Sequence, residues 1–339
     1  MKAYEVQGSF GIENLKIADR PDPKPGPGEV LVKVKATSIN YRDLLLVQGF
    51  YNPKQKLPII PFSDGAGEIV EVGEGVSQFK VGDRVADCFF QEWDSGPATP
   101  QKVMNASMGS PRDGMLTEYI VLKENGVVKL PDHLSYEEGA TLPCAGLTAW
   151  SCFFRHTNLN PGDTALMLGT GGVSVFGLQF AKMAGARAII TSSSDEKLER
   201  AKALGADATI NYKTHENWAK EVKSATGGAG VDHVIEVGGV GTLEQSIRST
   251  RMGGHISLVG VLGGPQAPIN LTLVLMQDIR IQGVFVGPRD AFEAMNKAIE
   301  QHQMKPAIDK VFPFSEAQQA LQYVASGSHF GKVIITVND

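Results

Sequence analysis

The segment "TALMLGTGGVSVFGLQFAK" holds the residues whose types and spacing point most clearly to chemistry. Its apolar start is typical of a buried strand and its end of a helix, and Gly169, Gly171 and Gly172 lie between them. A glycine-rich turn lets backbone N–H groups approach a pyrophosphate, and the helix N-terminus favours the negative charge. Ser174 is small enough to keep helix and strand close where a third glycine is usual. We expect Gly169, Gly171, Gly172 and Val173 to bind a dinucleotide; the alternative is a plain tight turn.

The residues after the next expected strand, "RAIIT", indicate which dinucleotide this would be. A carboxylate about 20 residues after the first glycine usually binds the adenosine ribose. Here the chain has Thr191, Ser192 and Ser193, with Lys197 and Arg200 one turn later. Hydroxyl groups and a cation suit a 2′-phosphate. Ser192, Ser193 and Lys197 therefore predict NADP(H) rather than NAD(H), unless the two cations only form the solvated face of a surface helix.

The order of strand-like and helix-like segments along the chain predicts the elements that position these residues. From about residue 136 onward, apolar strand-like runs alternate with helical patterns, which predicts βαβ units and a parallel sheet. The helix over "DEKLERAKALGA" has Ser193 and Glu196 at capping-box spacing and should end at Gly205. The first third, rich in Gly and Pro, shows the period-two alternation of strands instead. The fold class is therefore α/β, with a β-rich part before a doubly wound parallel sheet.

The composition of the chain limits which partners and which cellular compartment we expect for the protein. The 339 residues allow one large or two ordinary domains, and 42% hydrophobic residues can build their cores. A net charge of −5 gives no reason to expect nucleic acid or an anionic membrane as a partner. The chain has no apolar run of roughly 18 residues and no hydrophobic signal core at its start, so we expect a cytoplasmic protein.

Several segments, in order, are similar to the medium-chain dehydrogenase/reductase superfamily, and most of all to its zinc-lacking, quinone-oxidoreductase-like branch. They are "GPGEVLVKVKATSINYRD", "PFSDGAGEIVEVGEGVSQFKVGDRV", "GATLPCAGLTAW", "GTGGVSVFGLQFAK", "ALGADATINY", "GGHISLVG" and "GKVIITV". The resemblance implies a GroES-like catalytic domain made from residues 1–144 and 289–339. It also implies a Rossmann NADP-binding domain over residues 145–288, with the active cleft between the two domains.

Zinc alcohol dehydrogenases of this superfamily hold a catalytic zinc with Cys, His and Cys. Segment by segment, the resemblance puts Asn40, Ser63 and Cys144 at those three places, with Asp64 as the acidic neighbour. One thiolate cannot hold a zinc that needs three protein ligands. A structural zinc would need four cysteines near residues 88–115, where only Cys88 stands. We therefore expect no metal, and we interpret Cys144 as a small buried residue rather than a reactive thiol.

The resemblance also implies catalytic residues. Related quinone and enoyl reductases have an Asn near the nicotinamide and a Tyr that can donate a hydrogen bond to the substrate carbonyl, and the matching residues are Asn40 and Tyr51. Tyr51 could instead be a loop aromatic packed over the cleft. Tyr41 is an alternative phenol. Arg42 and Asp43 follow it directly and could form a structural salt bridge.

Further cofactor contacts are implied by the same resemblance, and each could instead be a structural strand or turn residue. Tyr212 would lie beside Lys197 at the 2′-phosphate, and the others would approach the nicotinamide or reach in from the end of the chain. They are Thr148, Gly260, Val261, Phe285, Val286 and Lys332. Residues 89–115 look like a long loop that could line the substrate pocket, with Phe89, Phe90 and Trp93 as candidates.

The leading hypothesis is a zinc-independent, NADPH-dependent reductase of a conjugated carbonyl such as a quinone, an enone or an enal. A zinc-free alcohol dehydrogenase or ketone reductase is the second possibility, although it would have to stabilise an alkoxide without a Lewis acid. A non-catalytic cofactor-binding protein is a third, because fold alone does not decide function. We also expect a homodimer, since "DIRIQGVFV" would be a long apolar strand at a sheet edge.

Overall fold

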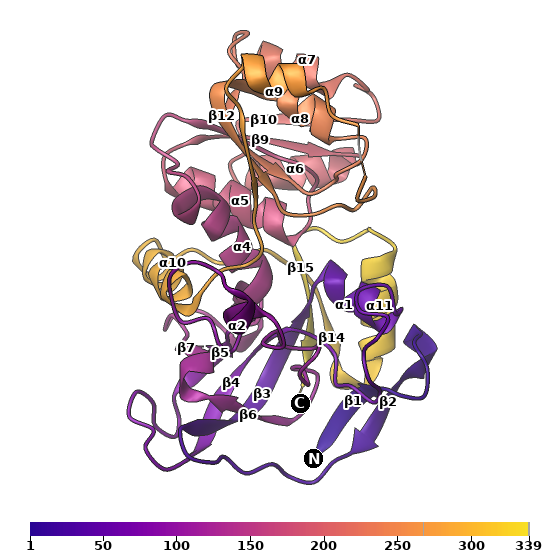
Figure 1. Cartoon of the computed structure of the whole chain (residues 1–339), viewed down its shortest axis with the longest axis vertical. Helices are drawn as coiled ribbons and strands as arrows, with labels where there is room; N and C mark the ends of the chain where they lie inside the picture. The colour runs from indigo at the N-terminus through magenta and orange to yellow at the C-terminus, as the bar shows by residue number, and fades with distance from the viewer. Residues whose placement is uncertain (267, 338–339) are drawn as a thin grey trace. The chain divides into compact units, whose positions relative to one another are not determined.

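The computed structural model describes residues 1–266 and 268–337, and the chain divides into two compact units (Figure 1). The β-rich unit combines Met1–Leu147 with Val286–Asp339, and the parallel-sheet unit is Thr148–Phe285. Each junction lies three residues from the boundary expected from the sequence. The chain re-enters the β-rich unit at Val286, a buried residue with a φ of 47°.

The β-rich unit is organised around a seven-stranded sheet of order β14-β15-β3-β4-β5-β7, with β6 also paired to β3. The long strand β3 (Glu29–Ile39) runs antiparallel to β4 (Asp64–Val72), with Ser38 opposite Asp64. It is also antiparallel to β15 (Lys332–Thr336), with Val333 opposite Ile39. The end of β3 therefore meets the starts of both β4 and β15, which brings together residues far apart in the sequence.

The remaining strands of this unit are short. They are β1 (Lys2–Val6), β2 (Leu15–Asp19), β5 (Arg84–Asp87), β6 (Tyr119–Lys123), β7 (Val127–Lys129) and β14 (Ile308–Pro313). Its helices are α1 (Tyr41–Val47), α2 (Pro100–Val103), α3 (Tyr136–Gly139), α10 (Arg289–Gln301) and α11 (Ala317–Ala325). Single helical turns occur at η1 (Ile12–Asn14), η2 (Glu124–Gly126), η3 (Leu142–Gly146) and η5 (Phe314–Glu316).

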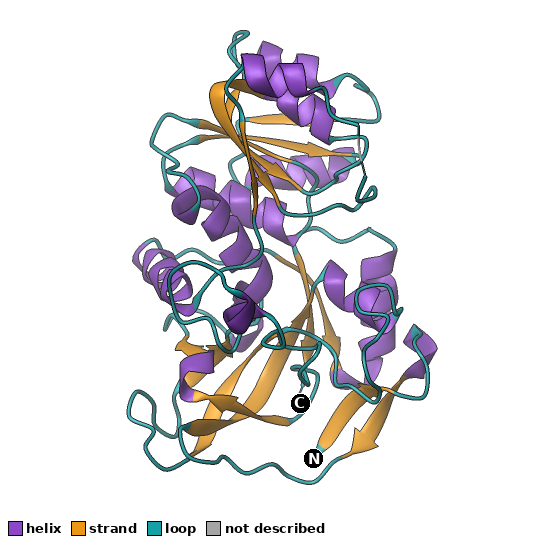
Figure 2. Cartoon of the chain, viewed as in Figure 1, coloured by secondary structure: helices purple, strands orange, loops and turns teal. Residues whose placement is uncertain are grey.

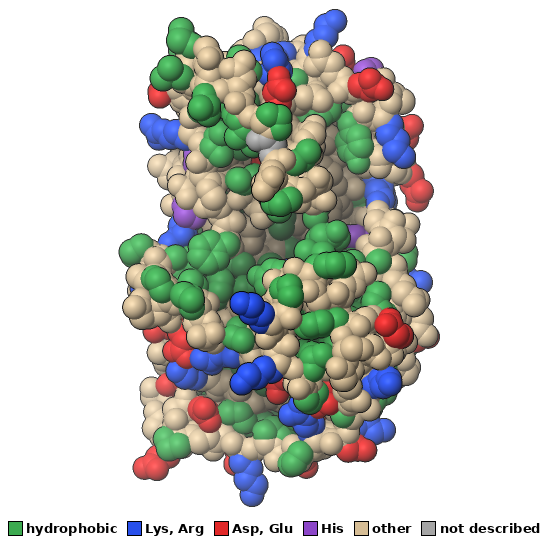
Figure 3. Space-filling view, turned by 45° about the vertical axis from the view of Figure 1, so that its right-hand side comes forward, with side chains coloured by type: hydrophobic (Ala, Val, Ile, Leu, Met, Phe, Trp, Pro, Cys, Tyr) green, Lys and Arg blue, Asp and Glu red, His purple; other side chains and the backbone are tan. Residues whose placement is uncertain are grey.

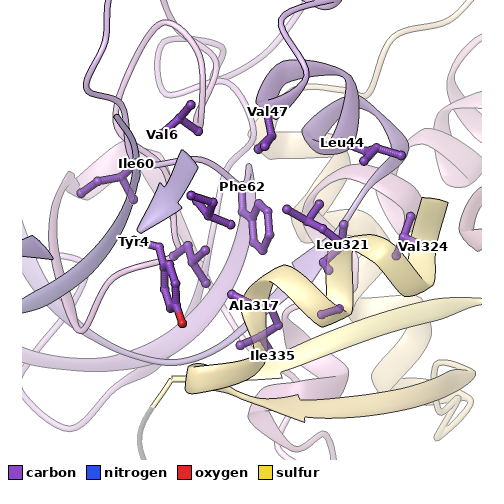
Figure 4. Packing of buried hydrophobic residues seen from close by; sticks show 14 of the residues in the cluster. Tyr4, Val6, Leu44, Val47, Ile60, Phe62, Ala317, Leu321, Val324 and Ile335 are labelled. Atoms are coloured by element: carbon purple, nitrogen blue, oxygen red, sulfur yellow. The ribbon is translucent and has the colours of Figure 1, made fainter. Parts of the chain in front are cut away.

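Helix α1 is held in place by a capping box and by a hydrophobic core. The Asn40 backbone N–H donates to the Asp43 carboxylate over 2.8 Å, which satisfies a donor at the helix N-terminus. On its inner face, Leu44 and Val47 pack into the same core as Leu321 and Val324 of α11 (Figure 4). The first turn of α1, which carries Tyr41 to Asp43, is therefore anchored from both ends.

The parallel-sheet unit has six parallel strands in the order β10-β9-β8-β11-β12-β13. They are β8 (Thr164–Met167), β9 (Arg187–Ser192), β10 (Ala208–Asn211), β11 (Val231–Glu236), β12 (Thr250–Leu258) and β13 (Arg280–Gly283). The direction of strand order reverses between β8 and β11. Doubly wound sheets bind dinucleotides beyond the carboxyl ends of the strands at this point.

Helices lie on both faces of the parallel sheet (Figure 2), as expected for a doubly wound fold. They are α5 (Gly172–Met183), α6 (Asp195–Ala203), α7 (Trp218–Ala225), α8 (Leu243–Ser249) and α9 (Leu271–Met276). A short helix α4 (Leu147–Trp150) and the turn η4 (Ser151–Arg155) lead into the sheet. Trp218, Val222 and Ile247 pack with Leu166 and Val234 of the strands to form the core. The predicted α/β class with a Rossmann sheet is confirmed.

Local details differ from the predictions in two places. Helix α6 is capped by Ser194, which accepts a hydrogen bond from the Lys197 N–H over 3.4 Å, and not by a box from Ser193 to Glu196. The edge strand β13 has four exposed residues and is shorter than predicted, because the chain leaves the sheet after Gly283. Gly205 follows the end of α6 with a φ of 97°, as expected for a left-handed cap.

One face of the molecule carries side chains of both charges. On the face shown in Figure 3, basic and acidic side chains alternate without a large field of one sign. Over the residues that the structure describes, no helix is both long enough and apolar enough to cross a membrane.

Candidate active site

A buried polar cluster, which we call the Lys332 cluster, forms where β3, β4 and β15 meet. The Lys332 ammonium donates to the Ile39 carbonyl over 2.9 Å and to the Asn40 Oδ1 over 2.6 Å. It lies 4.0 Å from the Asp64 Oδ2, and the side chains of Lys332 and Asp64 are both buried. The Asn40 Nδ2 in turn donates to the Ser63 Oγ over 3.3 Å. The cluster thus joins a cation, an amide, a hydroxyl and a carboxylate.

Asp64 is the anionic centre of the Lys332 cluster. Its carboxylate accepts hydrogen bonds from the Ser63 hydroxyl at 2.7 Å and from the Cys144 N–H at 3.0 Å. Burial raises the pKa of Asp64, while the nearby Lys332 charge opposes that rise. The chain reaches this point through Phe62, which is buried with a φ of 73°, a conformation that non-glycine residues rarely adopt. Such a conformation persists only where the surroundings enforce it.

Two further buried acids surround the Lys332 cluster. Burial raises the pKa of Asp43 to about 6, although the Arg42 charge acts in the opposite direction. Burial, reinforced by the charge of Asp64, raises the pKa of Asp87 well above its ordinary value. The Asp87 Oδ1 accepts the Gly65 N–H over 2.8 Å. Nothing in the sequence pointed to Asp87, because a single acid at the end of a short strand gives no signal.

The residues at the three zinc-ligand places do not fit a catalytic zinc. Asn40 and Ser63 are neutral and are already bonded within the cluster. Burial, with the charge of Asp64, raises the pKa of the Cys144 thiol, whereas a zinc ligand must be a thiolate. Lys332 places a fixed positive charge among them. Across residues 1–266 and 268–337, no group of three or more His, Cys, Asp or Glu side chains could hold a metal ion.

A second group, on the first turn of α1, contains a buried ion pair. The Arg42 Nη1 donates to the Asp43 Oδ1 over 3.1 Å and to the Met108 carbonyl over 3.0 Å. The guanidinium carbon lies 4.4 Å from the centre of the Tyr51 ring and 5.2 Å from that of Phe89. The salt bridge that the sequence allowed between Arg42 and Asp43 is present, and it is buried.

The other candidates for the substrate side have different surroundings. Tyr41 and Tyr51 are 46% and 47% exposed, so about half of each phenol side chain is accessible to solvent. Phe90 and Trp93 are buried, with ring centres 5.8 Å apart, and so belong to the interior rather than to an open pocket wall. Phe89 is buried too, but it contacts Arg42.

The glycine turn of the parallel-sheet unit has the geometry of a phosphate-binding loop. Gly169 has a φ of 71°, and a Cβ on Gly169 or Gly171 would meet no atom within 4 Å, so there is open space above the turn. Helix α5 begins after Gly171 without a side-chain cap, which leaves its first N–H groups to a ligand. Val173 lies in that first turn. The residues present therefore fit a dinucleotide pyrophosphate.

Two hydrogen bonds that the sequence did not predict hold this turn. The Thr191 Oγ1 accepts the Gly169 N–H over 3.2 Å, which ties the turn to the end of β9. The buried Ser174 hydroxyl donates to the Leu168 carbonyl over 2.6 Å. Helix α5 approaches the sheet closely at Gly177, where a Cβ would lie 2.6 Å from the Ile235 Cδ1. A small residue repeated along one helix face was the only available signal for Gly177.

The residues expected at the ribose lie at neighbouring strand ends. Ser192 ends β9 opposite Asn211 of β10, and the Tyr212 N–H donates to the Ser192 carbonyl over 3.0 Å. The buried Ser192 Oγ accepts the Ser194 N–H over 3.3 Å. Lys197, half-buried like Ser193, lies in the first turn of α6, which begins directly after these serines. Ser192, Lys197 and Tyr212 thus share one edge of the unit.

The loops after β11 and β12 are tied to each other by Glu236. This buried carboxylate accepts the Gly238 and Gly239 N–H groups over 2.7 and 3.1 Å, and its backbone carbonyl accepts the Gly260 N–H over 3.2 Å. The arrangement holds Gly260 and Val261 beyond the end of β12. Among the other candidates, Thr148 is buried and Phe285 is half-exposed, directly before the junction at Val286.

Comparison with known proteins identifies the family. A family model described as "Alcohol dehydrogenase GroES-like domain" matches residues 26–132, and one described as "Zinc-binding dehydrogenase" matches residues 172–301. A "Zinc-type alcohol dehydrogenase-like protein" of Schizosaccharomyces pombe is 45% identical over 335 residues, covering 97% of this chain and 96% of the relative. An "Acryloyl-coenzyme A reductase" of Metallosphaera sedula is 30% identical, covering 99% and 100%. A "Quinone-oxidoreductase QR1, chloroplastic" of Triphysaria versicolor is 31% identical, covering 99% and 98%.

Solved structures agree with this assignment. A putative alcohol dehydrogenase from Sinorhizobium meliloti superposes with a TM-score of 0.93 at 38% identity, covering 99% of this chain and 98% of that one. An NAD-dependent alcohol dehydrogenase superposes with a TM-score of 0.92 at 34% identity, covering 100% of both chains. The cofactor that goes with this family is a pyridine nucleotide, in agreement with the glycine turn. The chain therefore belongs to the medium-chain dehydrogenase/reductase superfamily and is an oxidoreductase of its alcohol-dehydrogenase-like type.

Proposed function

We propose that the protein is a zinc-independent, NADPH-dependent reductase of conjugated carbonyl compounds, such as quinones, enones or enals. The observation that carries the proposal is the Lys332 cluster, which puts an ammonium, an amide and a hydroxyl where a Lewis acid would need anionic or imidazole ligands. Without a Lewis acid, the electrophile has to be activated by its own conjugation. The names of an acryloyl-coenzyme A reductase and a quinone oxidoreductase among the relatives are in keeping with such substrates.

The residues of the β-rich unit then have separate tasks. Bound NADPH supplies the hydride. Negative charge develops on the carbonyl oxygen as the conjugated carbon is reduced, and a positioned hydrogen-bond donor stabilises it. Tyr51 is our candidate for that donor and for the proton, with Tyr41 or water as alternatives. Lys332 binds the Asn40 Oδ1, so it holds the amide plane of Asn40 in one orientation. Lys332 is accordingly a positioning residue.

The preference for NADPH rests on the edge formed by Ser192, Lys197 and Tyr212. These residues combine a hydroxyl, a cation and a phenol beside two strand ends, and residues 191–194 hold no carboxylate to bind a bare ribose. A 2′-phosphate carries negative charge and several acceptor oxygens, so it suits this set of donors. The cofactor contacts of Lys332 and of the loop residues Gly260, Val261, Phe285 and Val286 remain predictions.

An alcohol dehydrogenase or ketone reductase is the second candidate, because the solved structure of 34% identity is named an NAD-dependent alcohol dehydrogenase. The decisive experiment is a substrate panel with the purified protein. We expect NADPH oxidation with simple quinones or α,β-unsaturated ketones and negligible NADP reduction with primary alcohols. Fast alcohol oxidation without conjugated-carbonyl reduction would instead establish the second candidate.

A further inference from the structure

Arg42 is a buried cation that contacts two aromatic rings and two oxygen acceptors. Its side chain is 10% exposed, and the rings of Tyr51 and Phe89 lie near its guanidinium group. Its Nη1 serves both the Asp43 carboxylate and the Met108 carbonyl. Burial acts to lower the pKa of Arg42, but the charge of Asp43 and the interactions with Tyr51 and Cys144 together raise it, so the group stays protonated.

The opposite edge of the same guanidinium is unsatisfied. Among the described residues, the Arg42 Nε and Nη2 are buried without a hydrogen-bond partner. These two nitrogens carry the parallel N–H bonds that bind both oxygens of a carboxylate at once. A buried N–H group without a partner costs about 1–3 kcal/mol, and more when the group is charged. Such a pair of donors on a fixed cation therefore points to a ligand that completes it.

We propose that the Nε–Nη2 edge of Arg42 binds a carboxylate of the substrate when the Tyr51 ring moves away from the guanidinium group. The inference rests on the proposed function and narrows it to conjugated carbonyl compounds that also carry a carboxylate. Tyr51 lies over Arg42 yet is 47% exposed, so its ring can turn outward without leaving a buried site. A neutral carbonyl has one oxygen and would satisfy one donor, whereas a carboxylate satisfies both.

The positions of the surrounding charges support a carboxylate at this edge. Asp43 engages Nη1 at 3.1 Å, which leaves the Nε–Nη2 edge without that carboxylate. Asp64 and Lys332 form their own buried pair at 4.0 Å, so they do not compete for Arg42. The first turn of α1 is fixed by its capping box and by the core under Leu44 and Val47, so the edge is presented on a rigid element.

The test compares trans-3-benzoylacrylic acid with its methyl ester, two enones that differ in the carboxylate alone. With NADPH, we expect the wild type to have a kcat/KM for the acid about ten- to a hundredfold above that for the ester, the range for a hydrogen bond to a charged group. Arg42→Lys keeps the charge but not the paired edge. We expect it to lose most of that preference, so that the kcat/KM for the acid falls toward that for the ester.

Arg84→Lys is the matched control. Arg84 also lies over an aromatic ring, that of Tyr136 at 4.8 Å, and donates to the backbone carbonyls of Asp132 and Leu134. The Arg84→Lys variant should keep the preference of the wild type for the acid over the ester. An equal loss for acid and ester in Arg42→Lys, or a wild type without preference for the acid, would overturn the proposal.

A binding measurement separates this inference from the proposed function. Calorimetric titration of the NADP-loaded protein with benzoate needs no turnover. If neither enone is reduced, the proposed function fails, but benzoate binding that is lost in Arg42→Lys and kept in Arg84→Lys still upholds the carboxylate site. Should Arg42→Lys fail to fold, the wild type decides: absence of benzoate binding at tens of millimolar, together with no preference for the acid, refutes the site.

Discussion

Removing the ammonium of Lys332 tests whether the stability of the Lys332 cluster depends on a fixed cation. In Lys332→Met, the Asp64 carboxylate loses the cation 4.0 Å away and the Asn40 Oδ1 loses its 2.6 Å donor. Because both side chains are buried, breaking the pair should cost about 3–5 kcal/mol. We expect the urea midpoint of the β-rich unit to fall accordingly. Lys129→Met, at an exposed ion pair with Asp83, should cost about 1 kcal/mol or less.

The loss in Lys332→Met should also depend on pH with a definite sign. Burial raises the pKa of Asp64 and Lys332 counteracts it, so the variant raises the pKa of Asp64 in the folded state further. A carboxyl group whose folded pKa lies above its unfolded value stabilises the fold at low pH, and that stability is lost as pH rises through the folded pKa. The deficit relative to the wild type should therefore be larger at pH 8 than at pH 5.

A double variant completes this test. Lys332→Met with Asp64→Asn removes the unpaired charge, so much of the lost stability should return relative to Lys332→Met alone. Additive losses for the two substitutions would refute the pairing. A loss of stability in Lys332→Met no greater than that in Lys129→Met would also refute the pairing. So would a loss of stability that becomes smaller as the pH rises.

Four further outcomes are expected. Lys197→Ala should weaken NADPH binding about ten- to a hundredfold, measured by fluorescence titration, with little change for NADH; equal weakening of both would refute the 2′-phosphate site. Tyr51→Phe should lower the turnover of an enone roughly a hundredfold with NADPH affinity unchanged, and an unaltered rate would transfer the donor role to another group. Elemental analysis of protein purified without chelator should find far less than one zinc per chain, and mild chelation should not affect activity. Light scattering at micromolar concentration should give a homodimer, and Leu275→Lys should give a monomer, because Leu271 and Leu275 of α9 are 73% and 78% exposed beside the uncovered edge strand β13.

The parallel-sheet unit was readily predicted because its signals are local. The central strands of the sheet are buried on both faces, so they appear as short apolar runs, and each helix appears as a longer periodic one. The handedness of the crossovers then limits the strand order to few choices. The left-handed turns at Gly169 and Gly205 could be predicted because their backbone conformations are accessible to glycine at low cost. The cap of α6 was misplaced by one residue, since three consecutive serines offer equivalent hydroxyls.

The candidate site of the β-rich unit, in contrast, depends on contacts between distant segments. The sequence by itself predicted that Asn40, Ser63 and Cys144 do not form a zinc site, because ligand chemistry belongs to residue type. It did not place Lys332 against Asn40, which is 292 residues away, since that contact arises from the antiparallel register of β15 on β3. Nor did it show that one edge of Arg42 lacks a partner. Hydrogen-bond satisfaction depends on everything packed around a group, and only the tertiary structure decides what that is.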